Sequence, residues 1–153
     1  MRQLKCLFTL FFLLVSPLVA EPEMPSTYQP ELAQRAGADA YGMRPYVMAF
    51  LKKGPTRPTD TAEGSRLMRA HLDNIGRLVN EGKLCVAGPF SDDGEMRGIY
   101  IFCVNSVEEA RALTESDPAI KAGSLIMELH PWYGPAGLTL LEETQAKIRQ
   151  KKI

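Results

Sequence analysis

Residues 84–104 read LCVAGPFSDDGEMRGIYIFCV, and this stretch decides the fold. Two short apolar runs, at 84–87 and 98–104, flank a loop at 88–95 that consists largely of turn-forming residues. Apolar runs of this length bounded by turn residues are typical of strands. The stretch therefore predicts an antiparallel β-hairpin with a long tip.

A strand and a helix are predicted before the hairpin. The run YVMAFL at 46–51 is apolar and bounded by prolines and glycine, which is typical of a buried strand. Asp60 and Glu63 resemble a capping pair, and Gly82 is a natural helix end. Between them, apolar residues and one histidine recur at three- and four-residue spacing and predict one buried helix face: Leu67, Met68, His71, Leu72, Ile75, Leu78 and Val79.

After the hairpin, Ser106 and Glu109 form a capping box for a helix that runs to about Thr114. The dipeptide at 117–118, Asp-Pro, starts another helical turn that ends near Gly123. The run LIMEL at 125–129 predicts a fourth strand, which HPWYGP at 130–135 terminates.

The predicted order, β-α-β-β-α-β, indicates an α+β fold of the ferredoxin-like type. Right-handed crossovers place both helices on one face of a four-stranded antiparallel sheet. The predicted strands are apolar on both sides, so the other face of the sheet also needs cover. We expect a homodimer that forms through these sheet faces.

The two ends of the chain differ from this domain. Residues 1–20 combine a positive head, a short apolar run and a small residue at Ala20, as secretory signal peptides do; an uncleaved N-terminal anchor is the alternative. We divide the chain into this signal peptide, an arm at 21–45, a domain at 46–137 and a C-terminal helix or tail at 138–153, whose Thr139 and Glu142 resemble a second capping box. The expected location is the periplasm or the secreted fraction, without membrane attachment after cleavage.

Composition and absent motifs exclude several functions. The 153 residues carry 18 basic and 18 acidic side chains, so no basic field favours nucleic acid as a partner. The sequence contains no GxGxxG, P-loop, HExxH or GxSxG motif, which argues against nucleotide cofactors, zinc proteases and serine esterases. No cofactor and no metal are expected.

Five stretches resemble the YCII-related domain family over about residues 45–137: YVMAFLKKGP at 46–55, AHLDNIGRLVNEGKL at 70–84, AGPFSDDGEMRGIYIF at 87–102, ALTESDPAIKAG at 112–123 and ELHPWYGPAGL at 128–138. The resemblance implies a ferredoxin-like fold of the dimeric α/β-barrel group. It also implies kinship with muconolactone isomerases and with a dechlorinating enzyme for chlorinated hydroxyquinones. A helix histidine and an aspartate before proline have been proposed as an active pair in the family; they match His71 and Asp117. The export signal, the arm and the tail depart from the shorter cytosolic members.

His71 and Asp117 each have a functional and a structural interpretation. His71 lies on the apolar helix face and could act as general acid or base, or be a buried histidine at the edge of a cleft. Asp117 could orient His71, and it is also a good helix cap before Pro118. The two roles of Asp117 can coexist.

Two further segments are candidates for substrate binding. The segment of Gly88, Pro89, Phe90 and Ser91 could contact a ligand oxygen through its backbone amides and the Ser91 hydroxyl, unless it is an ordinary turn. His130 and Trp132 at 130–133 could line an organic-substrate pocket. Packing against a dimer partner or the tail is the alternative for this pair.

Cys85 and Cys103 are placed symmetrically about Gly94 in the predicted hairpin. A cross-strand disulfide and two buried free thiols are both compatible with that placement. A zinc site is disfavoured because no CxxC occurs.

These residues predict a cofactor-free lyase or isomerase acting on a small organic molecule, aromatic or lactone-like, with a His71–Asp117 pair. One alternative is a non-catalytic small-molecule-binding or accessory protein of the cell envelope. A structural dimer without any ligand is a third alternative.

Overall fold

The computed structural model describes residue 25 and residues 27–151. Four strands form one antiparallel sheet in the order β2-β3-β1-β4, which is the ferredoxin-like arrangement predicted from the sequence. The elements of the domain are β1 (Met43–Lys53), α2 (Thr61–Asn80), β2 (Leu84–Pro89), β3 (Met96–Phe102), α3 (Val107–Thr114), α4 (Pro118–Lys121) and β4 (Leu125–Pro135). They are flanked by α1 (Pro30–Ala36) before the sheet and by η1 (Ala136–Leu140) and α5 (Leu141–Ile148) after it.

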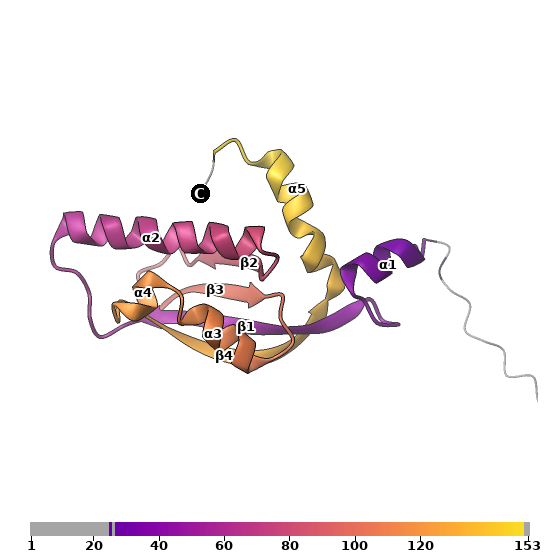
Figure 1. Cartoon of the computed structure of the whole chain (residues 1–153), viewed down its shortest axis with the longest axis horizontal. Coiled ribbons are helices and arrows are strands. Elements are labelled where there is room, and N and C mark those ends of the chain that lie inside the picture. Colours follow the sequence, from indigo (N-terminus) through magenta and orange to yellow (C-terminus); the bar gives the residue numbers. More distant parts are fainter. Residues whose placement is uncertain (1–24, 26, 152–153) are drawn as a thin grey trace, which may run out of the picture.

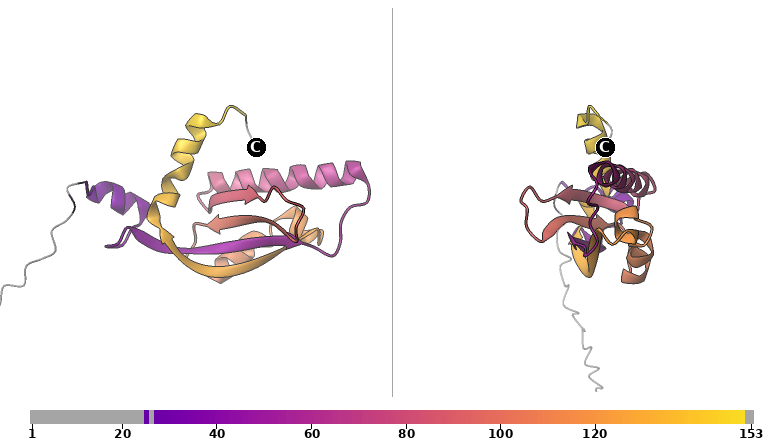
Figure 2. Two further views of the ribbon diagram at one scale, coloured as in Figure 1. Left: turned by 180° about the vertical axis from the view of Figure 1, so that it is seen from behind. Right: turned by 90° about the vertical axis from the view of Figure 1, so that its left-hand side faces the viewer.

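The helices α2, α3 and α4 cover one face of the sheet (Figures 1 and 2). Alternate residues of β1 point to that face, because successive side chains of a strand face opposite sides. Together with side chains from β2, β3, α2, α3 and the loop between β3 and α3 they form the hydrophobic core: Val47, Ala49, Leu51, Ile75, Leu78, Leu84, Tyr100, Phe102, Val104 and Ala110. Burial of these side chains fixes the position of α2 over the sheet.

The helix ends follow the predicted capping residues. The Asp60 carboxylate accepts hydrogen bonds from the amides of Ala62 and Glu63, at 3.1 and 3.3 Å. The Ser106 hydroxyl oxygen accepts from the Glu109 amide at 3.1 Å. Both N-terminal caps are confirmed, and each satisfies amides that the first turn of a helix leaves without partners.

Two predictions about the C-terminal part of the chain are wrong. β4 does not end at residue 129 but continues to Pro135, because β1 is longer than predicted and pairs with it from Met43↔Pro135 to Lys53↔Leu125. β4 is an edge strand, where prolines such as Pro131 are tolerated. The predicted cap at Thr139 also fails, since its hydroxyl donates back to the Ala136 carbonyl at 2.9 Å within η1.

The segment before the sheet is attached to the domain. Arg44 Nη1 donates to the Ala36 carbonyl at the end of α1 (3.3 Å), and the Tyr46 hydroxyl donates to the Pro135 carbonyl (2.8 Å). The predicted signal peptide at 1–20 lies outside the described residues. None of the helices within residues 25 and 27–151 is both long enough and apolar enough to cross a membrane.

The opposite face of the sheet carries no helix (Figure 2). Met48 and Phe50 of β1 alternate with the core residues and point to this open face, beside Ile99 of β3 and Ile126 of β4. Ile126 keeps 49% of its surface exposed. The structure thus leaves apolar side chains in the area where the sequence predicted a partner subunit.

A disulfide joins Cys85 of β2 to Cys103, just after β3, with 5.6 Å between the Cα atoms. Of the two alternatives left by the sequence, the structure contains the bridge. The two cysteines are not directly paired in the ladder, because Leu84 pairs with Phe102 and Val86 with Ile101. Cys85 is therefore the extra residue of a β-bulge.

Candidate functional site

His71 and Asp117 meet beneath α2. Nδ1 of His71 lies 2.8 Å from Oδ2 and 3.0 Å from Oδ1 of Asp117. Both side chains are buried: His71 is 7% exposed and Asp117 0%. A carboxylate beside one ring nitrogen keeps a proton on that nitrogen, so in the neutral imidazole Nδ1 donates to Asp117 and Nε2 is an acceptor. The structure brings the predicted pair together, and its catalytic role stays a prediction.

Asp117 also caps α4. Its Oδ1 accepts from the Ala119 amide at 2.8 Å, and Asn74 Nδ2 donates to its Oδ2 at 3.4 Å. Asn74 is held in turn by Arg77, whose Nη2 donates to Asn74 Oδ1 at 2.8 Å. The carboxylate thus has several donors around it, as a buried charge requires. The structural and positioning roles considered for Asp117 coexist in this geometry.

Tyr100 of β3 is the third member of the cluster. Its hydroxyl lies 3.3 Å from Nε2 of His71, and the two rings are stacked with centroids 6.2 Å apart. Because Nε2 is the acceptor, the Tyr100 hydroxyl donates to it. Burial, and secondarily the negative charge of Asp117, raise the pKa of Tyr100 far above its usual range, so the hydroxyl keeps its proton.

The sequence did not indicate Tyr100 as a site residue. One signal was present: Tyr100 alternates with core residues in an apolar strand, and a buried hydroxyl needs a hydrogen-bond partner. The sequence does not show which partner it finds.

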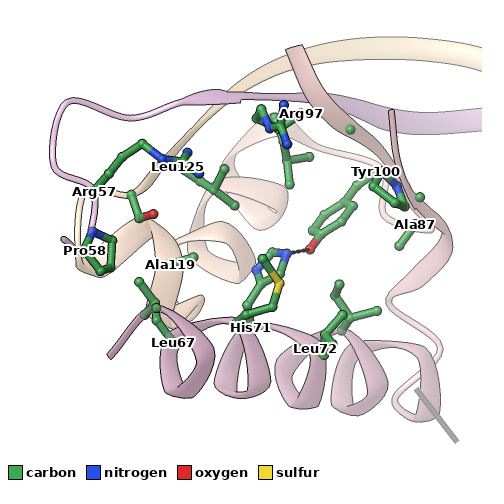
Figure 3. Close-up of a pocket in the computed structure, with 18 residues that line it drawn as sticks. Arg57, Pro58, Leu67, His71, Leu72, Ala87, Arg97, Tyr100, Ala119 and Leu125 are labelled. Carbon is green, nitrogen blue, oxygen red and sulfur yellow. Dashed lines mark hydrogen bonds between the residues drawn. The ribbon is translucent and has the colours of Figure 1, made fainter. Parts of the chain in front are cut away.

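A cavity of ≈ 380 Å³ opens between α2 and the sheet beside this cluster (Figure 3). Its volume suits a small organic ligand. Its walls are mainly apolar, and its polar groups are few. The lining residues are Leu51, Arg57, Pro58, Gly64, Leu67, Met68, His71, Leu72, Ile75, Ala87, Gly88, Pro89, Arg97, Gly98, Tyr100, Ala119, Ser124 and Leu125.

Of the predicted loop 88–91, the structure brings Gly88 and Pro89 to the cavity. Both belong to β2 rather than to a turn. Phe90 and Ser91 follow the strand and do not line the cavity, and Phe90 is 43% exposed. The two residues of this segment that belong to β2 therefore line the cavity, and the two that belong to the hairpin tip do not.

His130 and Trp132 are not brought to this cavity. Both alternate with Ile126 and Glu128 along β4, as predicted for His130, and this row faces the open side of the sheet. There His130 packs against Phe50, with 5.6 Å between ring centroids. The cavity lies on the helix side, so this position agrees with the alternative of packing on the sheet face.

No group of three or more His, Cys, Asp or Glu side chains in the described part of the chain could hold a metal ion. The acidic tip at 92–95 instead binds basic side chains of its own surroundings. Lys53 Nζ lies 3.6 Å from Glu95 and donates to the Asp93 carbonyl at 3.0 Å. The hairpin tip is thus a solvated turn with local ion pairing.

The YCII-related domain profile matches residues 47–133 of the chain. The chain belongs to the YCII-related domain family. It is similar to the uncharacterized protein YjpA of Bacillus subtilis (strain 168), with 34% identity over 62 residues, which are 40% of this chain and 71% of YjpA. A solved structure of similar sequence (26% identity) is 5-chloro-2-hydroxyhydroquinone dehydrochlorinase (TftG) from Burkholderia phenoliruptrix AC1100, in complex with 2,5-dihydroxybenzoquinone. The match covers 56% of this chain and 92% of that one, with a TM-score of 0.42.

The YCII-related domain contains the whole cluster described above. His71, Tyr100 and Asp117 all fall inside the matched region, as does every residue that lines the cavity. The helices α1 and α5 lie outside it. The residues of the candidate site therefore all lie within the matched domain, and none of them belongs to the arm or the tail.

Proposed function

We propose that this protein is an exported, cofactor-independent lyase or isomerase that moves a proton on a small organic molecule of aromatic or lactone-like form. One observation carries the proposal: His71 is held by Asp117 through one ring nitrogen, and both His71 and Tyr100 line an apolar cavity. A histidine oriented by a carboxylate can take and return a proton near neutral pH without a cofactor.

The proposed reaction needs only the side chains of the site to move the proton. A proton leaves a substrate carbon for Nε2 of His71, and the electron pair of the broken C–H bond moves into the substrate. In an isomerisation the same proton returns to another substrate atom. In an elimination a leaving group departs with its bonding pair, and Nε2 of His71 then releases its proton to the departed group or to solvent water. The Asp117 carboxylate stabilises the imidazolium formed in either case. The Tyr100 hydroxyl can then no longer donate to Nε2 and can donate to an oxygen that gains negative charge.

The cavity supports this chemistry by its composition. Leu67 and Leu72 of α2 and Leu125 of β4 form apolar walls around the polar cluster (Figure 3). Such walls favour an organic body and exclude water, which strengthens electrostatic interactions at the reacting atoms.

The test is a turnover screen of quinols, catechols and lactones with the wild type and His71→Ala. We expect His71→Ala to reduce turnover by about 10²-fold or more, the usual contribution of a general base. The matched control is His130→Ala, because His130 is the other histidine of the chain and lies on the far face of the sheet. Circular dichroism checks that each variant is folded. Turnover that survives in folded His71→Ala contradicts the proposal.

A second candidate function is ligand binding without turnover. It is favoured by one contact: the Tyr100 hydroxyl already occupies Nε2, so both ring nitrogens of His71 have partners. Calorimetry separates the two functions. A binding protein takes up a ligand of the screen unchanged, and its product analysis is negative for wild type and variant alike.

A further inference from the structure

We propose that the cavity binds substrates that carry a carboxylate, which Arg97 and Arg57 recognise at the end remote from His71. This inference rests on the proposed function in one respect, namely that the cavity is the substrate site. It adds the chemical class of the substrate and two binding residues that sequence analysis did not identify.

Arg97 reaches the cavity because of an irregularity in β3. Leu51 of β1 pairs with Gly98, but the next residue, Lys52, pairs with Met96. Arg97 is thus the extra residue of a β-bulge, and in a bulge the two residues opposite one partner can point to the same side. Gly98 faces the helices, and Arg97 lines the cavity with it instead of pointing to the open face of the sheet.

The hairpin tip holds the Arg97 guanidinium in place. Nη1 donates to the carbonyl oxygens of Asp92 and Gly94, at 3.1 and 3.4 Å. Carbonyl groups orient the side chain without neutralising its charge. Nε and Nη2 have no hydrogen-bond partner among residues 25 and 27–151, so one edge of the planar group stays available. Two parallel N–H groups on that edge match the two oxygens of a carboxylate.

Arg57 adds a second positive charge from the loop between β1 and α2. It lines the cavity and has no ion pair or side-chain hydrogen bond within the part of the chain that the structure describes. In Figure 3 the guanidinium groups of Arg57 and Arg97 lie on the sheet side of the cavity, opposite Leu67 and Leu72 of α2.

The side chains that line the cavity carry positive charge and no negative charge. The residues that line the cavity include two arginines and neither an aspartate nor a glutamate. The nearest buried acid of the site, Asp117, is already bound by His71, Asn74 and the Ala119 amide. Positive groups in a partly apolar hollow raise the local concentration of anions.

Position follows from the same geometry. In Figure 3 Arg57 and Arg97 lie away from the hydrogen bond between His71 and Tyr100, and Leu125 lies beside Arg57. A ligand that places its carboxylate on the arginines directs its apolar body along Leu125 and Leu67 toward Nε2 of His71. A single ring with one acidic substituent fits a hollow of ≈ 380 Å³.

The experiment compares acids with their neutral amides by titration calorimetry on the full chain. The probes are 2,5-dihydroxybenzoate against 2,5-dihydroxybenzamide, and 5-oxotetrahydrofuran-2-carboxylate against its carboxamide. We expect the acid of at least one pair to bind about tenfold tighter or more than its amide, as hydrogen bonds to a charged group warrant. Added salt should weaken this preference.

Three variants assign the preference to the arginines. Arg97→Gln should abolish it, Arg57→Gln should reduce it, and Arg111→Gln on the exposed face of α3 should leave it unchanged. If Arg97→Gln disturbs the hairpin, Arg97→Lys keeps the charge but not the two parallel N–H groups, and the preference for the acid should weaken. Arg57→Gln changes an exposed side chain and provides a second test.

Acid and amide that bind equally to the wild type overturn the inference and leave the proposed function intact. Failure of both pairs to bind overturns it as well. A clear preference for the acid that disappears in Arg97→Gln supports the anion site. If turnover is at the same time unchanged in His71→Ala, the proposed function is contradicted while the anion site stands.

Discussion

Nδ1 of His71 lies 2.8 Å from Oδ2 of Asp117, although 46 residues separate the two in the chain. The contact exists because α2 packs against α4, so that a histidine on the inner face of one helix meets the capping residue of the other. The same carboxylate caps α4 and orients the imidazole, which links the stability of the fold to the geometry of the site.

Asp117→Asn should separate these two roles. Asparagine caps a helix about as well as aspartate, so its oxygen should keep the hydrogen bond from the Ala119 amide and preserve the α4 cap. Its NH2 group replaces the oxygen that accepts from Nδ1 of His71, so stability should fall only by the loss of that hydrogen bond. The imidazolium loses its anionic partner, and we expect kcat to fall by about 10²-fold or more with little change in KM. Steady-state kinetics and urea denaturation measure both effects.

Asp117→Ala provides the contrast. It removes the cap and leaves the buried Nδ1 of His71 without a partner, which should cost about 1–3 kcal/mol of stability. Equal kcat in wild type and Asp117→Asn would show that the charge of Asp117 does not serve catalysis.

Tyr100 should influence stability at high pH. Its pKa is raised in the folded protein, chiefly by burial, above the ordinary value of 10.0. The folded state therefore keeps a proton that the unfolded state loses, and stability falls as the pH rises above about 10. The maximal contribution of one such group is about 1.4 kcal/mol per pH unit.

Tyr100→Phe should make this alkaline decline shallower. Urea denaturation at a series of pH values from 8 upward, roughly the range below and above the unfolded pKa, measures the difference between the two proteins. Parallel curves for wild type and variant would mean that Tyr100 ionises equally in both states. Below the unfolded pKa we expect a constant difference between the curves, because neither state has then lost the proton.

The sequence predicted the order of strands and helices because each element has a local signal. Short apolar runs, turn residues and caps such as Asp60 and Ser106 act over a few residues, and the structure confirms the strands and the two caps. The His71–Asp117 pair came from a family resemblance. Tyr100 and Arg97 were missed because their roles depend on what another strand or helix brings near them. A β-bulge in particular leaves no local pattern that shows where Arg97 points.

The disulfide between Cys85 and Cys103 should stabilise the fold. It closes a loop with a sequence separation of 18, for which the loss of chain entropy in the unfolded state predicts about 3 kcal/mol. Urea denaturation with and without a reductant measures the effect. The Cys85→Ser, Cys103→Ser double variant should match the reduced wild type and show no response to reductant. Identical unfolding midpoints of oxidised and reduced wild type would contradict this prediction.

We propose that the chain is exported and that residues 1–20 are removed, which the mass of the mature chain can test. If residues 1–20 act as a signal peptide, the chain produced in a Gram-negative bacterial host should appear in the periplasmic fraction with Glu21 as its first residue. Intact mass spectrometry of the fractions tests this. Replacing Leu13 and Leu14 by aspartate breaks the apolar run and should leave the chain uncleaved in the cytoplasm. A periplasmic chain of uncleaved mass would favour the N-terminal anchor instead.

We propose that two copies of the chain associate through the open faces of their sheets. Met48, Phe50 and Ile99 are half-buried there and Ile126 is 49% exposed, so a second sheet would remove apolar surface from water. Ile126→Lys places a charge in that contact and should shift the chain toward monomers in analytical ultracentrifugation.

The matched control is Ile148→Lys, because Ile148 is 67% exposed on α5, away from the open face. A wild type that sediments as a monomer at all concentrations, or an Ile126→Lys protein with unchanged association, would exclude this interface. A dimer lost in Ile126→Lys and kept in Ile148→Lys places the contact on the sheet, because the two variants add the same charge to exposed isoleucines of different surfaces.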